Sequence, residues 1–343
     1  TMEAATPTQT KQFKVIEFYS GIGGMRMVLD TAGIKYSQII AYEINEHANA
    51  VYQANFNEEP RQTDIRSVTK EFLDSFGADI WTMSPPCQPH TRQGKRLDTD
   101  DERSKSYLHI LQVLSTMENP PNMILLENVK NFEESDSCSN LLKILEQRDY
   151  DYRQFLLTPS QIGIPNERLR YYLVARRTPF QDKDSGKAEY LRSIDVKIPP
   201  NFEDRFAFKL NCDTIGDFLK FGDDLESFDQ EYLLKDNQLK TFLDIITRDS
   251  TGSCCFTKSY GRYFHGSGSV LQFKKLEKDP EKMEDFSGVL RMFTPEEVMT
   301  LQGFPKAFTF PAGLTKIQKY KLLGNSINVF VIYQVFNFLL TPQ

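Results

Sequence analysis

Residues 13–24 read FKVIEFYSGIGG, and this stretch decides the class of fold. The segment Phe13–Tyr19 has the apolar run of a buried strand, and a glycine turn follows it without a break. Residues Met25–Ala32 continue as a predicted helix. A strand, a glycine turn and a helix in this order open a doubly wound α/β unit. We therefore expect a parallel sheet covered by helices.

The glycine turn, Gly21–Gly24, is not a dinucleotide fingerprint, because Arg26 stands where that motif would have a further glycine. Binding of a pyrophosphate is therefore disfavoured. Glycines here would let backbone amides at a helix N-terminus approach a carboxylate, which suits a cofactor with an amino-acid end. A tight turn without a ligand is the alternative interpretation, and it stays open at this point.

The alternation of strands and helices continues up to Arg177. Further strands are predicted at 38–42, 63–65, 80–83, 123–126, 152–157 and 169–175, and helices at 46–55, 105–117 and 141–147. In a sheet of order 3-2-1-4-5, the glycine turn and the loop after residue 83 would flank the crevice where such sheets bind ligands. The strand that ends at Glu127 would lie one place further on.

Two acidic residues are candidates for contacts with a cofactor. Glu43 ends the predicted second strand about twenty residues after the glycine turn, where Rossmann-like folds place an acid on ribose hydroxyls. A charge that only starts the next helix is the alternative. Asp64 is placed near an adenine amino group by its position alone.

The loop after the strand 80–83 presents a cysteine. Residues 79–89 read DIWTMSPPCQP, so Cys87 directly follows Pro85 and Pro86. Because proline lacks an amide hydrogen, this segment can form neither a helix nor a paired β-strand. A buried cysteine in a turn is the ordinary alternative. The prolines instead favour a rigid loop that presents a reactive thiol.

Cys87, Glu127, Arg168 and Arg170 permit a specific chemistry. A thiolate that adds to carbon 6 of cytosine turns carbon 5 into a nucleophile toward a sulfonium methyl group. Nearby arginine would lower the pKa of the Cys87 thiol. Glu127 would hold nitrogen 3, Arg170 the O2 atom, and Arg168 the acid or a phosphate. In a strand, the side chains of Arg168 and Arg170 point to the same face of the sheet. A solvent-exposed strand face without a catalytic role is the alternative interpretation of this spacing. The target base would have to be flipped out or come from a loop.

A smaller domain is predicted after residue 177, and its stretch 252–275 alternates basic and aromatic residues without any acid. Such a pattern favours contact with single-stranded nucleic acid over an ordinary charged surface. The residues are Lys258, Arg262, Lys274 and Lys275 among Phe256, Tyr260, Tyr263, Phe264 and Phe273. Near the C-terminus, Thr294 and Glu297 predict a helix start, and a last helix, Ile327–Leu340, is expected to pack back on the first domain.

Composition sets limits on the class of protein. The 343 residues suffice for about two domains, and the net charge of −6 speaks mildly against bulk binding of nucleic acid. Five cysteines without a CxxC pair predict a reducing compartment, the cytoplasm or also the nucleus, and no structural zinc. The longest apolar stretch, 329–340, is shorter than the roughly twenty residues of a membrane span, so we expect neither an anchor nor a signal peptide.

Six motifs in order resemble those of the cytosine-5 methyltransferases. They are FYSGIGG (18–24), PPCQP (85–89), ENV (127–129), RLR (168–170), FTPE (293–296) and GNS (324–326). The resemblance implies a Rossmann-like α/β methyltransferase domain at 13–177, completed by about 310–343, and a target-recognition domain at 178–309. The segment 1–12 is polar and has no pattern, so we expect a mobile leader there. It implies S-adenosyl-L-methionine as the cofactor, with S-adenosyl-L-homocysteine as its product. The implied cofactor contacts are Tyr19, Ser20, Gly21, Ile22, Gly23, Gly24, Glu43, Ile44, Asp64, Ile65, Ser84, Asn325 and Ser326.

Within that family, Asn166 and the run Cys255–Lys258 resemble the DNA-methyltransferase-like enzymes that methylate tRNA-Asp at cytosine 38. The implied partner is therefore tRNA, with contacts at Arg92, Lys130, Cys255, Phe256, Thr257 and Lys258, and a monomer without membrane contact is expected. A DNA enzyme and a catalytically silent RNA-binding module remain as alternatives. A cytosine deaminase is disfavoured, because its H-x-E and P-C-x-x-C zinc motifs are missing.

Overall fold

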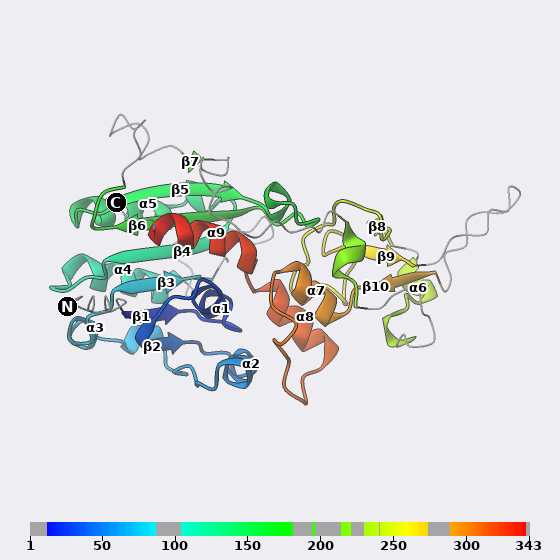
Figure 1. Cartoon of the computed structure of the whole chain (residues 1–343), viewed down its shortest axis with the longest axis horizontal. Coiled ribbons are helices and arrows are strands. Elements are labelled where there is room, and N and C mark those ends of the chain that lie inside the picture. The colour runs from blue at the N-terminus through cyan, green and yellow to red at the C-terminus, as the bar shows by residue number, and fades with distance from the viewer. Residues whose placement is uncertain are drawn as a thin grey trace, which may run out of the picture.

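The computed structural model describes residues 12–86, 104–180, 194–195, 214–220, 230–239, 241–273 and 289–340. Figure 1 shows a larger lobe built on one sheet and a smaller lobe beside it; the described elements of the smaller lobe come after Asp195, and the last helix lies on the larger lobe again. Cys87, Arg92, Lys274, Lys275 and the predicted leader up to residue 11 lie outside the described residues.

The larger lobe contains a seven-stranded sheet of order β2-β1-β3-β4-β6-β5-β7. The first four of these strands are parallel, whereas β6 runs antiparallel to both of its neighbours. Because β2, β1, β3 and β4 are consecutive, the predicted order around the crevice is confirmed. The strands are β1 (Phe13–Phe18), β2 (Tyr36–Tyr42), β3 (Ile80–Met83), β4 (Met123–Val129), β5 (Asp151–Leu157), β6 (Arg170–Arg176) and β7 (Ile194–Asp195).

The strand predicted at 63–65 is wrong. Asp64 instead caps a single 3-10 turn, η1 (Ile65–Ser67), by accepting a hydrogen bond from Arg66 N (2.9 Å). This local bond curls the chain away from a ladder. The pairing beyond β2 is reduced to an isolated bridge between Tyr42 and Arg61.

Helices cover both faces of the sheet, so two separate apolar cores form, one on each side (Figure 1). Alternate residues of β1 divide between them, with Val15 in one core and Ile16 and Phe18 in the other. The covering helices are α1 (Gly24–Thr31), α2 (Glu46–Phe56), α3 (Lys70–Phe76), α4 (Lys105–Thr116), α5 (Asp136–Gln147) and α9 (Val329–Leu340). Helix α5 begins earlier than predicted, because the Ser135 hydroxyl accepts from Cys138 N (3.1 Å) and caps it.

The C-terminal helix α9 returns to the sheet and packs against α1, β4 and β6, as predicted. It starts at Val329 rather than Ile327, because the Asn328 side chain accepts from Val331 N (3.1 Å). The segment Lys316–Leu340 is long and apolar enough to be compared with a membrane span, but more than half of its most apolar window is buried inside the fold. It is therefore part of the core.

The predicted domain boundaries at residues 177 and 309 stay a prediction.

The smaller lobe has a three-stranded sheet of order β10-β9-β8. Its elements are α6 (Asp236–Leu239), β8 (Ile245–Ile246), β9 (Val270–Gln272), β10 (Leu290–Met292), α7 (Pro295–Leu301) and α8 (Lys316–Gly324). Helix α7 begins with the predicted capping box, in which Thr294 and Glu297 exchange hydrogen bonds. The buried carboxylate of Glu297 also accepts two bonds from Arg291 (2.7 and 2.8 Å).

Candidate active site

The glycine turn lies directly against α2, and its backbone explains its sequence. Gly21 and Gly23 have φ values of +54° and +90°, where a side chain would be strained. A Cβ atom on Gly23 would also lie 2.2 Å from the ring of Phe56. The turn therefore needs glycine for packing as well as for conformation. The hydroxyl of Ser20 is buried beside it without a hydrogen-bond partner among the described residues, so the turn has an unused polar group.

The Glu43 carboxylate is held at the carboxyl end of β2. It accepts hydrogen bonds from Gly21 N (3.0 Å) and Asn45 N (2.9 Å), so the glycine turn itself orients the acid. The next side chain, Ile44, is 68% exposed, which is unusual for a large apolar residue. An acceptor for hydroxyl groups next to free apolar surface fits the ribose and purine of an adenosine group.

Three loops converge at this edge of the sheet. The Ser84 hydroxyl after β3 donates to the Tyr19 carbonyl after β1 (2.9 Å). Burial raises the pKa of the Tyr19 phenol above its ordinary range, and the negative charges of Asp64 and Glu43 raise it further. Both predicted cofactor acids therefore lie near the ring of Tyr19. The carboxylate of Asp64 is paired with Arg66 (2.6 Å), which lowers the pKa of Asp64.

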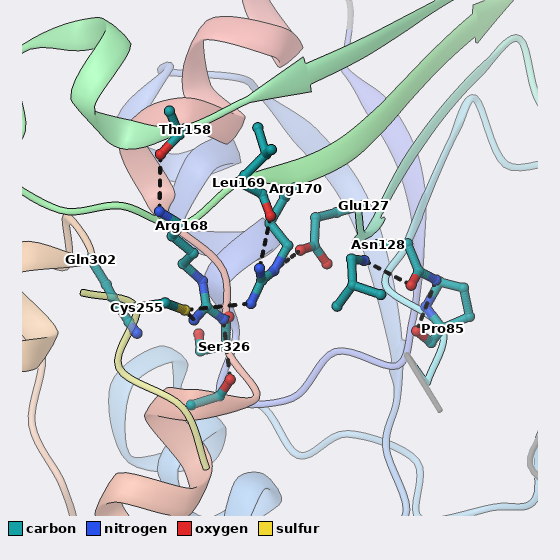
Figure 2. A network of polar contacts seen from close by, with 12 residues as sticks. Pro85, Glu127, Asn128, Thr158, Arg168, Leu169, Arg170, Cys255, Gln302 and Ser326 are labelled. Atoms are coloured by element: carbon teal, nitrogen blue, oxygen red, sulfur yellow. Dashed lines mark hydrogen bonds and ion pairs between the residues drawn. The ribbon is translucent and has the colours of Figure 1, made fainter. Parts of the chain in front are cut away.

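The loop that leads to Cys87 is tied to the end of β4. The buried amide of Asn128 donates to the carbonyl of Pro85 (3.3 Å), as Figure 2 shows. Sequence reasoning gave Asn128 no role of its own, although it lies inside the ENV motif. The described chain stops at Pro86, so the placement and role of Cys87 stay a prediction.

Glu127 is a buried acid beside an arginine. Its Oε1 atom lies 3.5 Å from Arg170 Nε, and only 8% of the residue is exposed. Burial raises the pKa of Glu127 above its ordinary value of 4.5, while the positive charges of Arg170 and Arg168 act in the opposite direction. A carboxyl group in this setting can keep or share a proton, as the predicted contact with a base nitrogen requires.

Arg168 holds distant segments of the fold together. Its guanidinium is buried and donates to the carbonyls of Phe256 (3.2 Å) and Gly324 (3.2 Å). It also donates to the carbonyl of Ser326, as Figure 2 shows. These bonds join the segment just before β6 to two segments that are about 90 and 160 residues away in the chain. The Arg168 Nε atom, by contrast, has no hydrogen-bond partner among the described residues, and the predicted role of Arg168 in positioning the acid or a phosphate stays a prediction.

The thiol of Cys255 lies between the two arginines, which the sequence did not indicate. Its sulfur is 3.4 Å from Arg168 Nη1 and 3.8 Å from Arg170 Nη2. Burial by itself would raise the pKa of Cys255, but the two guanidinium groups outweigh this effect and lower it. Cys255 was placed only among residues that contact tRNA. Its proximity to Arg170, and through it to Glu127, could not be found without the tertiary structure.

Gly324 lies where the end of α8 meets the segment Cys255–Lys258. A Cβ atom on Gly324 would lie 2.0 Å from Lys258 N and 2.3 Å from the Thr257 carbonyl carbon. The backbone of the Cys255–Lys258 segment is thus pressed against the end of α8. Asn166 fastens the same segment by donating to the Cys254 carbonyl (3.1 Å).

The remaining predicted contacts differ in exposure. Lys130, Lys258 and Asn325 are exposed, Thr257 and Ser326 are half-buried, and Ile22 and Ile65 are core side chains that offer only their backbone. Interpretation of the aromatic residues as stacking partners is wrong for Phe256, Tyr260 and Phe264, whose rings pack in the core. No cluster of histidine, cysteine and acidic residues that could hold a metal occurs among the residues that the structure describes.

Comparison with known proteins agrees with this geometry. Residues 13–340 match the family model of the C-5 cytosine-specific DNA methylases, so the chain belongs to the C-5 cytosine methyltransferase family, whose members use S-adenosylmethionine. It is more narrowly similar to the Dnmt2 group. The crystal structure of S. pombe Dnmt2 methyltransferase superimposes with a TM-score of 0.80 at 34% identity, covering 96% of this chain and 98% of that one.

Two curated relatives carry different substrate names. The tRNA (cytosine(38)-C(5))-methyltransferase of Schizosaccharomyces pombe is 36% identical, over 97% of this chain and 98% of its own. The DNA (cytosine-5)-methyltransferase of Dictyostelium discoideum is also 36% identical, over 97% and 96%. The chain is thus a cytosine-5 methyltransferase, while these names leave the nucleic acid undecided.

Proposed function

We propose that this enzyme methylates carbon 5 of a cytosine in tRNA, at position 38 of the anticodon loop of tRNA-Asp, through a covalent adduct with Cys87. The observation that carries the proposal is the buried pair of Glu127 and Arg170, at the end of the strand whose Asn128 holds the approach to Cys87. The carboxyl end of β4 thus brings together a proton donor, Glu127, a positive charge, Arg170, and the start of the loop that carries the predicted thiol.

The proposed reaction consists of an addition, a methyl transfer and an elimination. The Cys87 thiolate donates an electron pair to carbon 6, and Glu127 stabilises the charge that develops at nitrogen 3 by a hydrogen bond. Carbon 5 would then be the nucleophile toward the sulfonium methyl group that a bound S-adenosylmethionine would supply, and the sulfur–methyl bond would break to leave S-adenosylhomocysteine. Loss of the proton on carbon 5 to solvent and departure of the thiolate restore the aromatic ring. Arg170 would neutralise charge near the ring during addition.

The cofactor would bind where the glycine turn meets β2. Glu43 would accept from the ribose hydroxyls, Ile44 would cover the purine, and the free Ser20 hydroxyl would bond the amino-acid end. The described residues fit this group, because the acceptor is already oriented by Gly21 N and the apolar surface of Ile44 is exposed. Asp64 would reach the adenine amino group only if its pair with Arg66 rearranged.

We propose tRNA as the substrate because of the segment Cys255–Lys258 and because several relatives are named as tRNA methyltransferases. The exposed cations Lys130 and Lys258, which come from different lobes, would contact its phosphates. Duplex DNA is the second candidate, because the Dictyostelium relative bears that name.

Transfer of labelled methyl groups to purified tRNA-Asp, to other tRNAs and to duplex DNA tests the proposal directly. We expect label on tRNA-Asp at cytosine 38 and its loss in Cys87→Ala, which should still bind S-adenosylhomocysteine. Preferential labelling of DNA would overturn the substrate, and undiminished turnover of Cys87→Ala would overturn the covalent route.

A further inference from the structure

Three exposed large hydrophobic side chains come from one stretch of the smaller lobe. Among the residues that the structure describes, four such side chains are exposed, and one of them, Ile44, belongs to the proposed cofactor site. The other three, Phe242 (75%), Ile245 (38%) and Tyr263 (70%), all come from residues 242–263 of the smaller lobe. Clustered exposure of this kind marks an interaction surface more often than chance.

The loop that presents Tyr263 is firmly built. Thr257 N donates to Ser267 O (2.9 Å) and closes the loop, and Tyr263 N donates to Ser259 O (3.1 Å) within it. The inward rings of Tyr260 and Phe264 anchor it in the core. The outward residues Arg262, Tyr263 and His265 are therefore held by a rigid base.

A second ring joins this loop from an earlier segment. Phe242 meets the ring of His265 edge-on, with centroids 5.4 Å apart and planes at 65°. The two residues are 23 positions apart in sequence, so the contact is a product of the fold. Phe242 and His265 consequently form an exposed aromatic pair next to Tyr263 and Arg262.

The charge of this loop suits a polyanion. Residues 254–273 include Lys258 and Arg262, both exposed, and no acid. The neighbouring acid Asp244 is turned inward, because its carboxylate accepts from the Ser269 hydroxyl. Lys258 also lies against Gly324, so the loop is continuous with the junction that holds Arg168.

We infer that Phe242, Arg262, Tyr263 and His265 form a second RNA-binding surface, on which unpaired bases of the substrate stack outside the target cytosine. This inference rests on the proposed function and extends it to the recognition of the substrate. Rings stack on any base, and arginine contacts the backbone, so the surface would recognise a single-stranded loop by its shape. Paired bases of a duplex do not offer their faces in this way.

Substitution of the rings tests the inference. Phe242→Ala and Tyr263→Ala should each raise the KM for tRNA about 5- to 100-fold, with kcat and the Kd for S-adenosylhomocysteine unchanged. Tyr263→Trp should keep the wild-type KM, because it retains a stacking face. Ile245→Ala is the matched control, since Ile245 is exposed in the same region but has no ring, and its KM should not change.

The outcomes separate this inference from the proposed function. An unchanged tRNA KM in both alanine variants, with normal methylation by the wild type, overturns the RNA-binding surface alone. Sedimentation that shows altered self-association with an unchanged KM overturns it in favour of a protein contact. A wild-type enzyme that methylates duplex DNA and no tRNA overturns the proposed function itself.

Discussion

The buried carboxyl group of Glu17 offers a quantitative test of the fold. It lies 1% exposed on β1, and one of its oxygens accepts from the Tyr52 hydroxyl (3.1 Å) while the other has no partner among the described residues. Burial raises the pKa of Glu17 from 4.5 to about 8, against the opposing effects of the Tyr52 hydrogen bond and the Arg26 charge. Glu17 is therefore a neutral acid in the folded protein at neutral pH.

The sign and size of the effect follow from proton linkage. The folded state binds this proton more tightly than the unfolded state, so the contribution of Glu17 to stability is greatest below pH 4.5 and falls as pH rises toward 8. Holding the carboxyl protonated lowers the free energy of unfolding by about 1 kcal/mol at pH 5 and about 3 kcal/mol at pH 7. Between these pH values the wild type should therefore lose about 2 kcal/mol that Glu17→Gln does not lose.

Urea unfolding at pH 5 and pH 7 measures this difference. Taking the difference between the two pH values cancels the cost of packing an amide in place of the acid. The exposed Glu134→Gln serves as control and should follow the wild type. If Glu17→Gln and the wild type change in parallel from pH 5 to pH 7, the carboxyl does not hold its proton on folding and the reasoning is refuted.

Three further substitutions address single contacts. Gly324→Ala would press a methyl group against Lys258 N, 2.0 Å away, and should lower kcat/KM for tRNA by on the order of a hundredfold, while calorimetry shows unchanged binding of S-adenosylhomocysteine. Gly23→Ala combines a φ of +90° with a clash against Phe56 and should weaken S-adenosylhomocysteine by on the order of tenfold in the same assay; equal affinity would show that the turn does not contact the cofactor. Thr294→Ala removes the cap of α7 and should cost about 1 kcal/mol in urea unfolding at pH 7, and a stability equal to wild type would contradict the capping-box account.

Local signals in the sequence identified most elements of the sheet lobe. The strand 80–83 was predicted with its observed ends, and the order of the central strands followed from strand and helix alternation. The capping box at Thr294 was also readable, because both of its partners lie within four residues. By contrast, α3 and α8 were missed, and residues 63–65 were misread because the local bond from Arg66 N to Asp64 outweighed a short strand pattern.

The candidate site divides in the same way. Its motif residues Glu127, Arg168 and Arg170 could be singled out from chemistry and order along the chain. Their actual roles could not, since Arg168 finds its partners at Phe256, Gly324 and Ser326. Glu43, which is predicted to contact the cofactor, lies at the glycine turn and accepts from Gly21 N, only 22 residues away in sequence.

The amino-acid sequence by itself determined the class of fold and the order of the motifs, because strand periodicity, glycine turns and caps depend on neighbours within a few residues. The resemblance of those motifs to the cytosine-5 methyltransferases indicated the reaction. Only the tertiary structure decided which rings are buried and which are free: Phe256 and Tyr263 look alike in sequence, yet one is 3% and the other 70% exposed. It also decided that the Cys255 sulfur lies between two arginines. These properties depend on surfaces that distant segments cover, and periodicity within one segment does not reveal what packs against it.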